Sequence, residues 1–180
     1  MKAANKMAGM ASFPGIDGKI IPFGVNKAVE LGRQKNIPYI LGSNSEDMVP
    51  PIFYGMVMDW CKGQSAAGMA PSYAYHFSRQ LPGDEEGAWH SADLWYWFGT
   101  LDNCWRPMTE KDRELSRQMV DYLTNFAKTG DPNGEGIPRW DAVTQIQGNV
   151  LCLGEGDTTM GQPDLAKLQW NMENRRSVGE

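Results

Sequence analysis

The sequence predicts an α/β fold, because a segment with helical periodicity at residues 25–35 is followed directly by a short apolar run at residues 37–42 that ends at a glycine. Such a run suits a fully buried parallel strand, and helices alternating with strands are typical of this class. The length of 180 residues, 41% of them hydrophobic, suits one core, so we expect residues 1–180 to form a single domain. The 20 Gly and 11 Pro predict many turns between short elements.

Several shorter segments also carry secondary-structure signals. Residues 13–22 predict two short extended pieces around an Asp-Gly turn, because Gly tolerates the positive φ of a tight hairpin. Residues 49–68, rich in Met, aromatic and small side chains, predict a buried or lid-like helix that ends near Gly63. Residues 72–78 alternate with the period of a strand, and residues 149–153 predict a last strand. The helix at residues 25–35 is expected to turn one face inward, made of Val25, Ala28, Val29 and either Leu31 or Gly32.

The clearest element is a helix over residues 109–129. Thr109 is a suitable N-cap with Asp112 three residues later, and Gly130 ends the helix just before an Asp-Pro pair. Five apolar side chains fall on one face: Leu115, Met119, Tyr122, Leu123 and Phe126. After the last strand, the tail through Arg175 and Arg176 is predicted to be helical or frayed.

Composition excludes several classes of partner. The net charge of −5, with scattered Lys and Arg, gives no electrostatic footprint for nucleic acid or for an anionic membrane. Cys61, Cys104 and Cys152 form no C-x-x-C pair, which favours free buried thiols and no zinc site. We expect a cytoplasmic protein, since no apolar run resembles a secretory signal or a membrane span. No sequence motif indicates a metal or an organic cofactor, and we expect neither.

The chain contains two histidines, which differ in their surroundings. His90 follows a predicted strand and turn and precedes a dense aromatic run, where an imidazole could reach a reacting group as a general acid or base. The alternative is an ordinary hydrogen-bonded histidine. His76 alternates with aromatic residues along a predicted strand, and we expect it to be structural.

Two adjacent carboxylates, Glu46 and Asp47, lie just past the carboxyl end of the predicted buried strand. Catalytic groups of open α/β sheets gather at that edge. A carboxylate there could accept the Nδ1 hydrogen of an imidazole, fix its tautomer and stabilise the imidazolium. The alternative is that the two carboxylates cap the helix that follows.

Four ordered segments are distinctive: GSNSED at residues 42–47, GAWHSADLWYWFGTL at residues 87–101, WRP at residues 105–107 and LTNFAKTGDPN at residues 123–133. Together they closely resemble the type-B carboxylesterase family, which includes bacterial para-nitrobenzyl esterases and, more distantly, cholinesterases. The resemblance spans nearly the whole chain. It implies the C-terminal part of an α/β-hydrolase fold, with a mostly parallel sheet flanked by helices, and hydrolysis of carboxylic esters through a Ser-acid-His triad.

The resemblance also implies roles for particular positions. His90 matches the triad histidine, the general base that later protonates the leaving alcohol. The triad acid falls on Asp47, in a pattern that the family writes Gly-x-Asn-x-Asp-Glu-Gly. Here Glu46 precedes Asp47 and Met48 replaces the last Gly, so Glu46 stays open as the alternative acid.

Other matched positions are expected to support the histidine and the substrate. Asp93, three residues past the histidine, matches an acidic residue of the family that supports the triad without contacting the substrate. Trp89, Trp95 and Trp97 are expected to line or support an apolar pocket for a small carboxylic ester.

The family's nucleophile motif, Gly-x-Ser-x-Gly, does not occur in the 180 residues. The nearest string, GQSAAG at residues 63–68, has Ala at the second Gly position and follows the candidate acid, against the Ser, acid, His order of this fold. We therefore do not expect Ser65 to be the nucleophile. The serine and the oxyanion hole are expected in an N-terminal part of the same enzyme, and the isolated chain is expected to lack turnover.

A second hypothesis comes from a different class. A truncated relative could have kept this half of the fold as a non-catalytic binding or scaffold module that uses its aromatic surface. Half of a doubly wound sheet also exposes an apolar face and an open strand edge, so we expect the chain to self-associate or to need its N-terminal complement.

Overall fold

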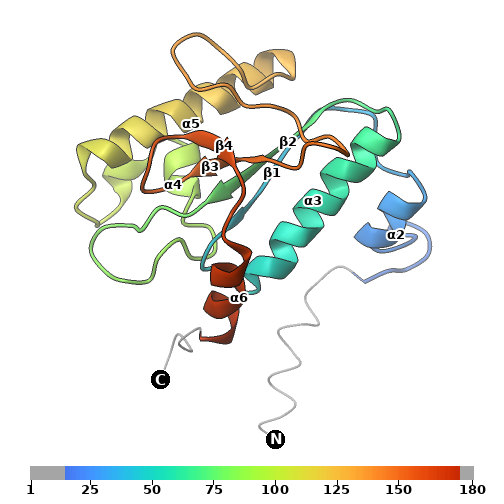
Figure 1. Ribbon diagram of the computed structural model, residues 1–180, viewed down its shortest axis with the longest axis horizontal. Helices are drawn as coiled ribbons and strands as arrows, with labels where there is room; N and C mark the ends of the chain where they lie inside the picture. The colour runs from blue at the N-terminus through green and yellow to red at the C-terminus, as the bar shows by residue number, and fades with distance from the viewer. Residues whose placement is uncertain (1–14, 175–180) are drawn as a thin grey trace, which may run out of the picture.

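The computed structural model describes residues 15–174, and four strands form one sheet in the order β1-β2-β3-β4 (Figure 1). The strands are β1 (Tyr39–Asn44), β2 (Ser72–Phe77), β3 (Val150–Leu153) and β4 (Thr159–Gly161). The first three are parallel and β4 is antiparallel to β3. This mostly parallel sheet confirms the predicted class, and strands were predicted near the positions of β1, β2 and β3.

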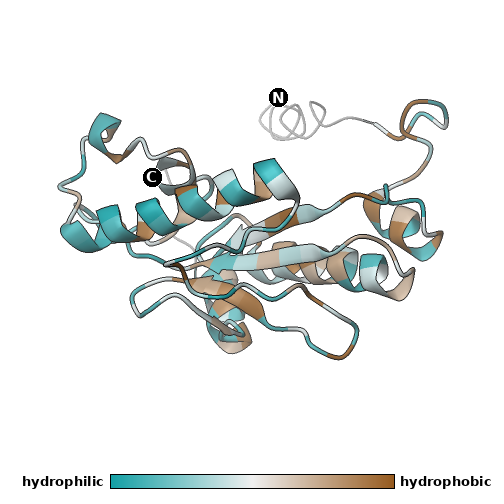
Figure 2. Ribbon diagram, turned by 90° about the horizontal axis from the view of Figure 1, so that it is seen from above, coloured by the Kyte–Doolittle hydropathy of each residue, from teal (hydrophilic) through white to brown (hydrophobic). Residues whose placement is uncertain are grey.

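Residues 15–174 also contain six helical segments: α2 (Val25–Glu30), α3 (Pro50–Ala66), α4 (Leu94–Trp97), the 3-10 turn η2 (Leu101–Asn103), α5 (Glu110–Thr129) and α6 (Leu165–Glu173). The connection from β1 to β2 runs through α3, and the connection from β2 to β3 runs through α4 and α5. Figure 2 shows the strands between α3 and α5, so helices cover both faces of the sheet. Parallel strands need such crossovers, because a short turn cannot return the chain to the same end of the sheet.

Side chains along β2 alternate between two apolar clusters. Tyr73 and Phe77 belong to the larger cluster, which includes residues of α4 and α5, while Ala74 belongs to a smaller cluster with residues of α3 and α6. The strand is therefore buried on both faces, as expected for a central strand under helices on both sides. Along residues 72–78, alternate side chains therefore enter two different buried clusters. The alternation does not mark one buried and one exposed face.

Helix α5 forms as its local signals predict. The Thr109 side chain accepts from the Asp112 amide, and the Asp112 carboxylate accepts from the Thr109 amide, which completes a capping box. Gly130 ends the helix at φ 78°, a left-handed conformation that Gly adopts without a Cβ penalty. Apolar side chains of the predicted face pack into the larger cluster: Leu115, Met119, Tyr122, Leu123 and Phe126.

The predicted hairpin at residues 13–22 is wrong where the structure describes it, because residues 15–24 contain no strand. The Asp17 carboxylate instead accepts from the backbone amides of Lys19, Ile20 and Ile21, each at 2.9 Å. Asp commonly makes such local bonds, and they close the turn without a partner strand. Residues 13 and 14 of this prediction lie outside the described residues, as do Arg175 and Arg176.

Two predictions of burial are also wrong. The helix predicted at residues 25–35 is the short α2, which buries none of its residues, and Val25 and Leu31 are exposed. Strand β1 is the edge strand of the sheet within the described residues, and its first four residues are half-buried instead of fully buried. Periodicity identifies the apolar face of an element, but it does not say whether the same 180 residues provide the surface that covers it.

The three cysteines are free thiols, as predicted, although only Cys61 is fully buried and Cys104 and Cys152 are half-buried. Burial raises the pKa of the Cys61 thiol to about 12, which keeps it protonated at neutral pH. None of the helices in residues 15–174 is long and apolar enough to cross a bilayer.

Candidate active site

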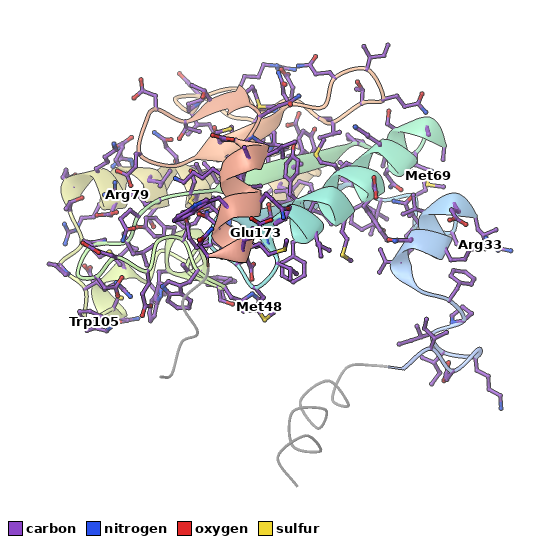
Figure 3. The ribbon with its side chains drawn as sticks, turned by 60° about the horizontal axis from the view of Figure 1, so that its bottom comes forward. Arg33, Met48, Met69, Arg79, Trp105 and Glu173 are labelled. Atoms are coloured by element: carbon purple, nitrogen blue, oxygen red, sulfur yellow. The ribbon has the colours of Figure 1, made fainter. Side chains whose placement is uncertain are left out.

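Two loops meet beyond the carboxyl ends of β1 and β2. The loop after β1 pairs with the loop before α4 through a parallel bridge between Glu46 and Trp89, and the Glu46 amide donates to the Ala88 carbonyl at 3.1 Å. Figure 3 shows the side chains at this end of the molecule, with Met48 near α6. In open α/β sheets, this edge is where functional side chains from different strands converge. The two predicted site segments are therefore brought together, although 43 residues separate the acid from the histidine.

His90 and Asp47 form the centre of this meeting point. The His90 Nδ1 atom lies 2.9 Å from the Asp47 Oδ1 atom. The Asp47 side chain is only 9% exposed, whereas the His90 side chain is 57% exposed. The same Asp47 oxygen accepts from the Met48 amide at 2.6 Å, which fixes the carboxylate. An imidazole held through Nδ1 directs Nε2 outward, where it can exchange a proton with a reacting group.

Glu46, the alternative acid, points elsewhere. Its Oε2 atom accepts from the Ala88 amide at 2.8 Å and from the Ser45 hydroxyl, and its Oε1 atom accepts from Asn171 Nδ2 at 3.0 Å. The structure therefore places Asp47, and not Glu46, against His90. The two adjacent carboxylates leave the backbone in different directions, and of the two only that of Asp47 lies within hydrogen-bonding distance of the imidazole.

Asp93 lies behind the histidine in a buried polar network. Its two oxygens accept from the Tyr75 hydroxyl at 2.7 Å and from Asn44 Nδ2 at 3.1 Å. Asn44 also donates to the Trp89 carbonyl at 2.8 Å, which fixes the backbone next to His90. Burial and the neighbouring Asp93 charge hold the pKa of Tyr75 well above its usual range, so the phenol stays a hydrogen donor.

Sequence reasoning missed the partners of Asp93. Asn44 belongs to the GSNSED segment, and its place at the end of a predicted strand was a usable signal. Tyr75 carried no such signal, because its alternation with other aromatic residues indicates only a strand. The position of the Tyr75 ring requires Gly at position 42, because a Cβ there would lie 2.1 Å from the ring. Asn171, which binds Glu46, lies 125 residues away from it in the sequence, beyond any local pattern.

The three tryptophans of the predicted pocket do not share one environment. Trp97 is buried in the core. Its ring centroid lies 4.9 Å from that of Tyr75 and 6.4 Å from that of Trp140, on which it stacks. Trp89 and Trp95 are half-buried and pack against the same cluster. The structure thus gives Trp97 a supporting place inside the fold, and leaves only Trp89 and Trp95 near enough to the surface to meet a ligand.

Ser65 lies far from His90. It is in the last turn of α3, and Asp47 precedes the first turn of the same helix. Fifteen residues separate Ser65 from Pro50, the first residue of α3, so the helix carries Ser65 roughly 22 Å from the acid loop. The two ends of α3 lie toward opposite ends of the strands, so Ser65 is not placed to react with His90.

His76 is buried in β2, 3.4 Å from the Ser43 hydroxyl and edge-on to the Tyr54 ring. Burial, and to a lesser degree the charge of Lys167, lowers the pKa of His76 from 6.5 to about 4. Neutral His76 fits the structural role that the sequence suggested.

This shift predicts how the folded state responds to acid. Between pH 6.5 and pH 4 the unfolded chain takes up the His76 proton and the folded chain does not, so stability falls as the pH falls through this window. At about 1.4 kcal/mol per unit, the loss approaches ~3 kcal/mol. The carboxyls of Asp17, Asp84 and Asp112, whose pKa values are lowered from 3.8, contribute mainly below about pH 5 and equally in the parent chain and the variant. Urea midpoints of the parent chain should fall across this window, and those of His76→Gln should fall much less. Equal slopes would contradict this prediction.

Comparisons with known proteins point to one family. The model of the carboxylesterase family matches residues 47–170. Carboxylesterase 5A of Felis catus is 40% identical over 89 residues, which are 43% of this chain and 16% of that protein. Carboxylesterase 1F of Mus musculus is 28% identical over 185 residues, which cover 93% of this chain and 32% of that protein.

Solved structures show the same fold. An esterase from Clostridium hathewayi, described as able to hydrolyze aliphatic aromatic polyesters, superposes with a TM-score of 0.57 at 27% identity, over 68% of this chain and 24% of its own. A thermophilic PNB esterase superposes with a TM-score of 0.70 at 19% identity, over 94% of this chain and 47% of its own. The architecture is that of the α/β-hydrolase fold, and the chain spans less than half the length of these relatives. Since the family model matches more than half of the 180 residues, the chain belongs to the carboxylesterase family.

Proposed function

We propose that this chain supplies the acid and the base of a serine esterase that hydrolyses small carboxylic esters. The contact that carries the proposal is the 2.9 Å approach of His90 Nδ1 to Asp47 Oδ1, with the carboxylate buried and the imidazole open to the outside. In this arrangement the buried carboxylate fixes the imidazole tautomer and stabilises its protonated form.

The reaction needs a serine from outside these 180 residues. His90 Nε2 removes the proton of that serine hydroxyl as its oxygen attacks the ester carbonyl, and then gives the proton to the departing alcohol. The acyl group now on the serine is released when His90 activates a water molecule in the same way. Asp47 stays ionised throughout, and backbone amides of the missing part hold the oxyanion.

The partner in this proposal is the N-terminal part of the same enzyme. Strand β1 ends the sheet and is only half-buried along its first four residues, so one edge of a parallel strand lacks a neighbour among the described residues. Apolar side chains near the ends of β1 and along α3 are exposed: Ile37, Met48, Ile52 and Met56. An added strand and helix would bury this surface, and without them the chain should self-associate.

The test restores the missing part. The chain is co-expressed with the nucleophile-bearing segment of mouse carboxylesterase 1F, the co-purifying complex is isolated, and its hydrolysis of para-nitrophenyl acetate is measured. We expect turnover by the complex, none above buffer by the chain alone, and loss in the complex with His90→Ala. The complex with His76→Gln, a change to the structural histidine, should keep its turnover. A folded complex whose turnover survives His90→Ala would overturn the proposal and favour a non-catalytic binding module.

A further inference from the structure

We infer that Glu46 is a positioning residue, whose carboxylate connects the acid loop, the His90 loop and α6 and thereby holds the imidazole on Asp47. The inference rests on the proposed acid and base roles of Asp47 and His90. It assigns a task to the acidic residue that does not face the histidine. Three contacts of the carboxylate and the backbone geometry of the His90 loop support it.

The Glu46 carboxylate accepts from three donors on three segments. Oε2 accepts from the buried Ala88 amide at 2.8 Å in the His90 loop and from the Ser45 hydroxyl in the acid loop. Oε1 accepts from Asn171 Nδ2 of α6 at 3.0 Å, and the same Nδ2 group donates to the Ser45 carbonyl at 2.8 Å. Among residues 15–174, no salt bridge includes Glu46, so neutral donors hold its charge. Donors to an ionised acceptor make the stronger class of hydrogen bond.

These contacts lie on both sides of the acid and base pair. Asp47 follows Glu46 directly, and Ala88 precedes His90 by two residues. The Glu46 amide also donates to the Ala88 carbonyl, so backbone and side chain fix the same residue. A shift of the Ala88 backbone would move the imidazole relative to the carboxylate, and a shift of well under 1 Å is enough to weaken a 2.9 Å hydrogen bond.

The His90 loop depends on such anchors because its backbone is unusual. Gly87 has φ 72°, and a Cβ there would lie 2.6 Å from Glu46 Cδ, so Gly lets the carboxylate approach closely. On the other side of His90, Ser91 has φ 69° and is the one non-Gly residue with positive φ among the described residues. A residue held in this region persists only where its surroundings over-determine it. Glu46 provides one such restraint at the start of the loop.

The variant Glu46→Gln tests this role with little change in shape. Ala88 and Asn171 donate to different oxygens of the Glu46 carboxylate, and Gln replaces one of these oxygens with an NH₂ group, so it cannot accept from both donors in this geometry. We expect amide hydrogen exchange at Ala88 to accelerate at least tenfold, and 15N NMR of the His90 ring to show a smaller fraction of the Nδ1–H tautomer. Glu86→Gln makes the same chemical change at an exposed residue and should leave both readouts at parent values.

A second substitution supplies the rescue. Asn171→Asp alone puts a second carboxylate beside Glu46 and should also accelerate exchange at Ala88. In the double variant Glu46→Gln/Asn171→Asp, the carboxylate introduced at position 171 can accept from the NH₂ group introduced at position 46, so exchange at Ala88 should be slower than in either single variant. Coupling of this kind appears only if the two side chains act through their contact. Should Glu46→Gln not fold, Asn171→Ala removes one donor and should shift both readouts by a smaller amount in the same direction.

Three results would overturn the inference. They are parent values of both readouts in Glu46→Gln, exchange that rises equally throughout the sheet and helices, and strict additivity in the double variant. Asp47→Asn separates this inference from the proposed function. If Asp47→Asn changes the His90 tautomer and Glu46→Gln does not, only the role of Glu46 fails. If Asp47→Asn leaves the tautomer unchanged, the proposed acid and base pair itself fails.

Discussion

In the complex with a nucleophile-bearing segment, Asp47→Asn should lower kcat by about 10⁴-fold with little change in KM. One Asp47 oxygen accepts from both His90 Nδ1 and the Met48 amide, whereas Asn has a single oxygen and no charge to stabilise the imidazolium; where its NH₂ group faces the imidazole, it donates instead. The imidazole would then carry its hydrogen on Nε2, the atom that has to accept the serine proton. Substrate binding does not use this carboxylate, so the loss should fall on the chemical step.

Steady-state kinetics on a para-nitrophenyl ester would measure this effect. Asp59→Asn is the matched control, since Asp59 is an exposed residue of α3 and makes no salt bridge within the described residues. It should leave kcat unchanged. A loss below tenfold in Asp47→Asn, in a complex that still needs His90, would show that another group orients the imidazole.

The largest effect on stability should come from Asp112→Ala. Asp112 is fully buried and accepts from Arg79 Nε, from the Tyr96 hydroxyl and from the Thr109 amide, each at 2.8 Å. Burial alone would raise the pKa of this carboxyl, but the bonds from Arg79, Thr109 and Tyr96 lower it to about 2. The change to Ala would leave Arg79, itself buried, with Glu155 as its remaining partner and would remove the capping box of α5.

Breaking one side of a buried ion pair costs about 3–5 kcal/mol, and we expect Asp112→Ala to lower the free energy of unfolding by this amount. Urea unfolding at one fixed protein concentration would measure it. Asp102→Ala provides the control, because Asp102 lies 3.8 Å from Arg113 at an exposed site, where an ion pair contributes at most about 1 kcal/mol. Similar losses for the two variants would mean that Arg79 finds other partners or water.

The sequence by itself determined the elements whose signals are local. Helix α5 begins and ends where Thr109 and Gly130 indicate, because caps act through backbone groups within a few residues. The segments GSNSED and GAWHSADLWYWFGTL identified the family and the two site loops, since each is continuous in the chain. One local prediction is wrong: residues 15–24 contain a bend held by local hydrogen bonds of Asp17 and Gly18, without the two strands that a hairpin needs.

Only the tertiary structure decided which carboxylate faces the histidine. Asp47 and Glu46 are chemically similar neighbours, and their order in the sequence carries no direction in space. The pairing of the two loops turns one side chain toward His90 and the other toward Ala88 and Asn171. The tertiary structure also decided which side chains are buried, because the exposed fraction of a side chain depends on which other elements pack against its own. Trp97 is enclosed by residues from distant segments, whereas β1 has no neighbouring strand on one side within residues 15–174.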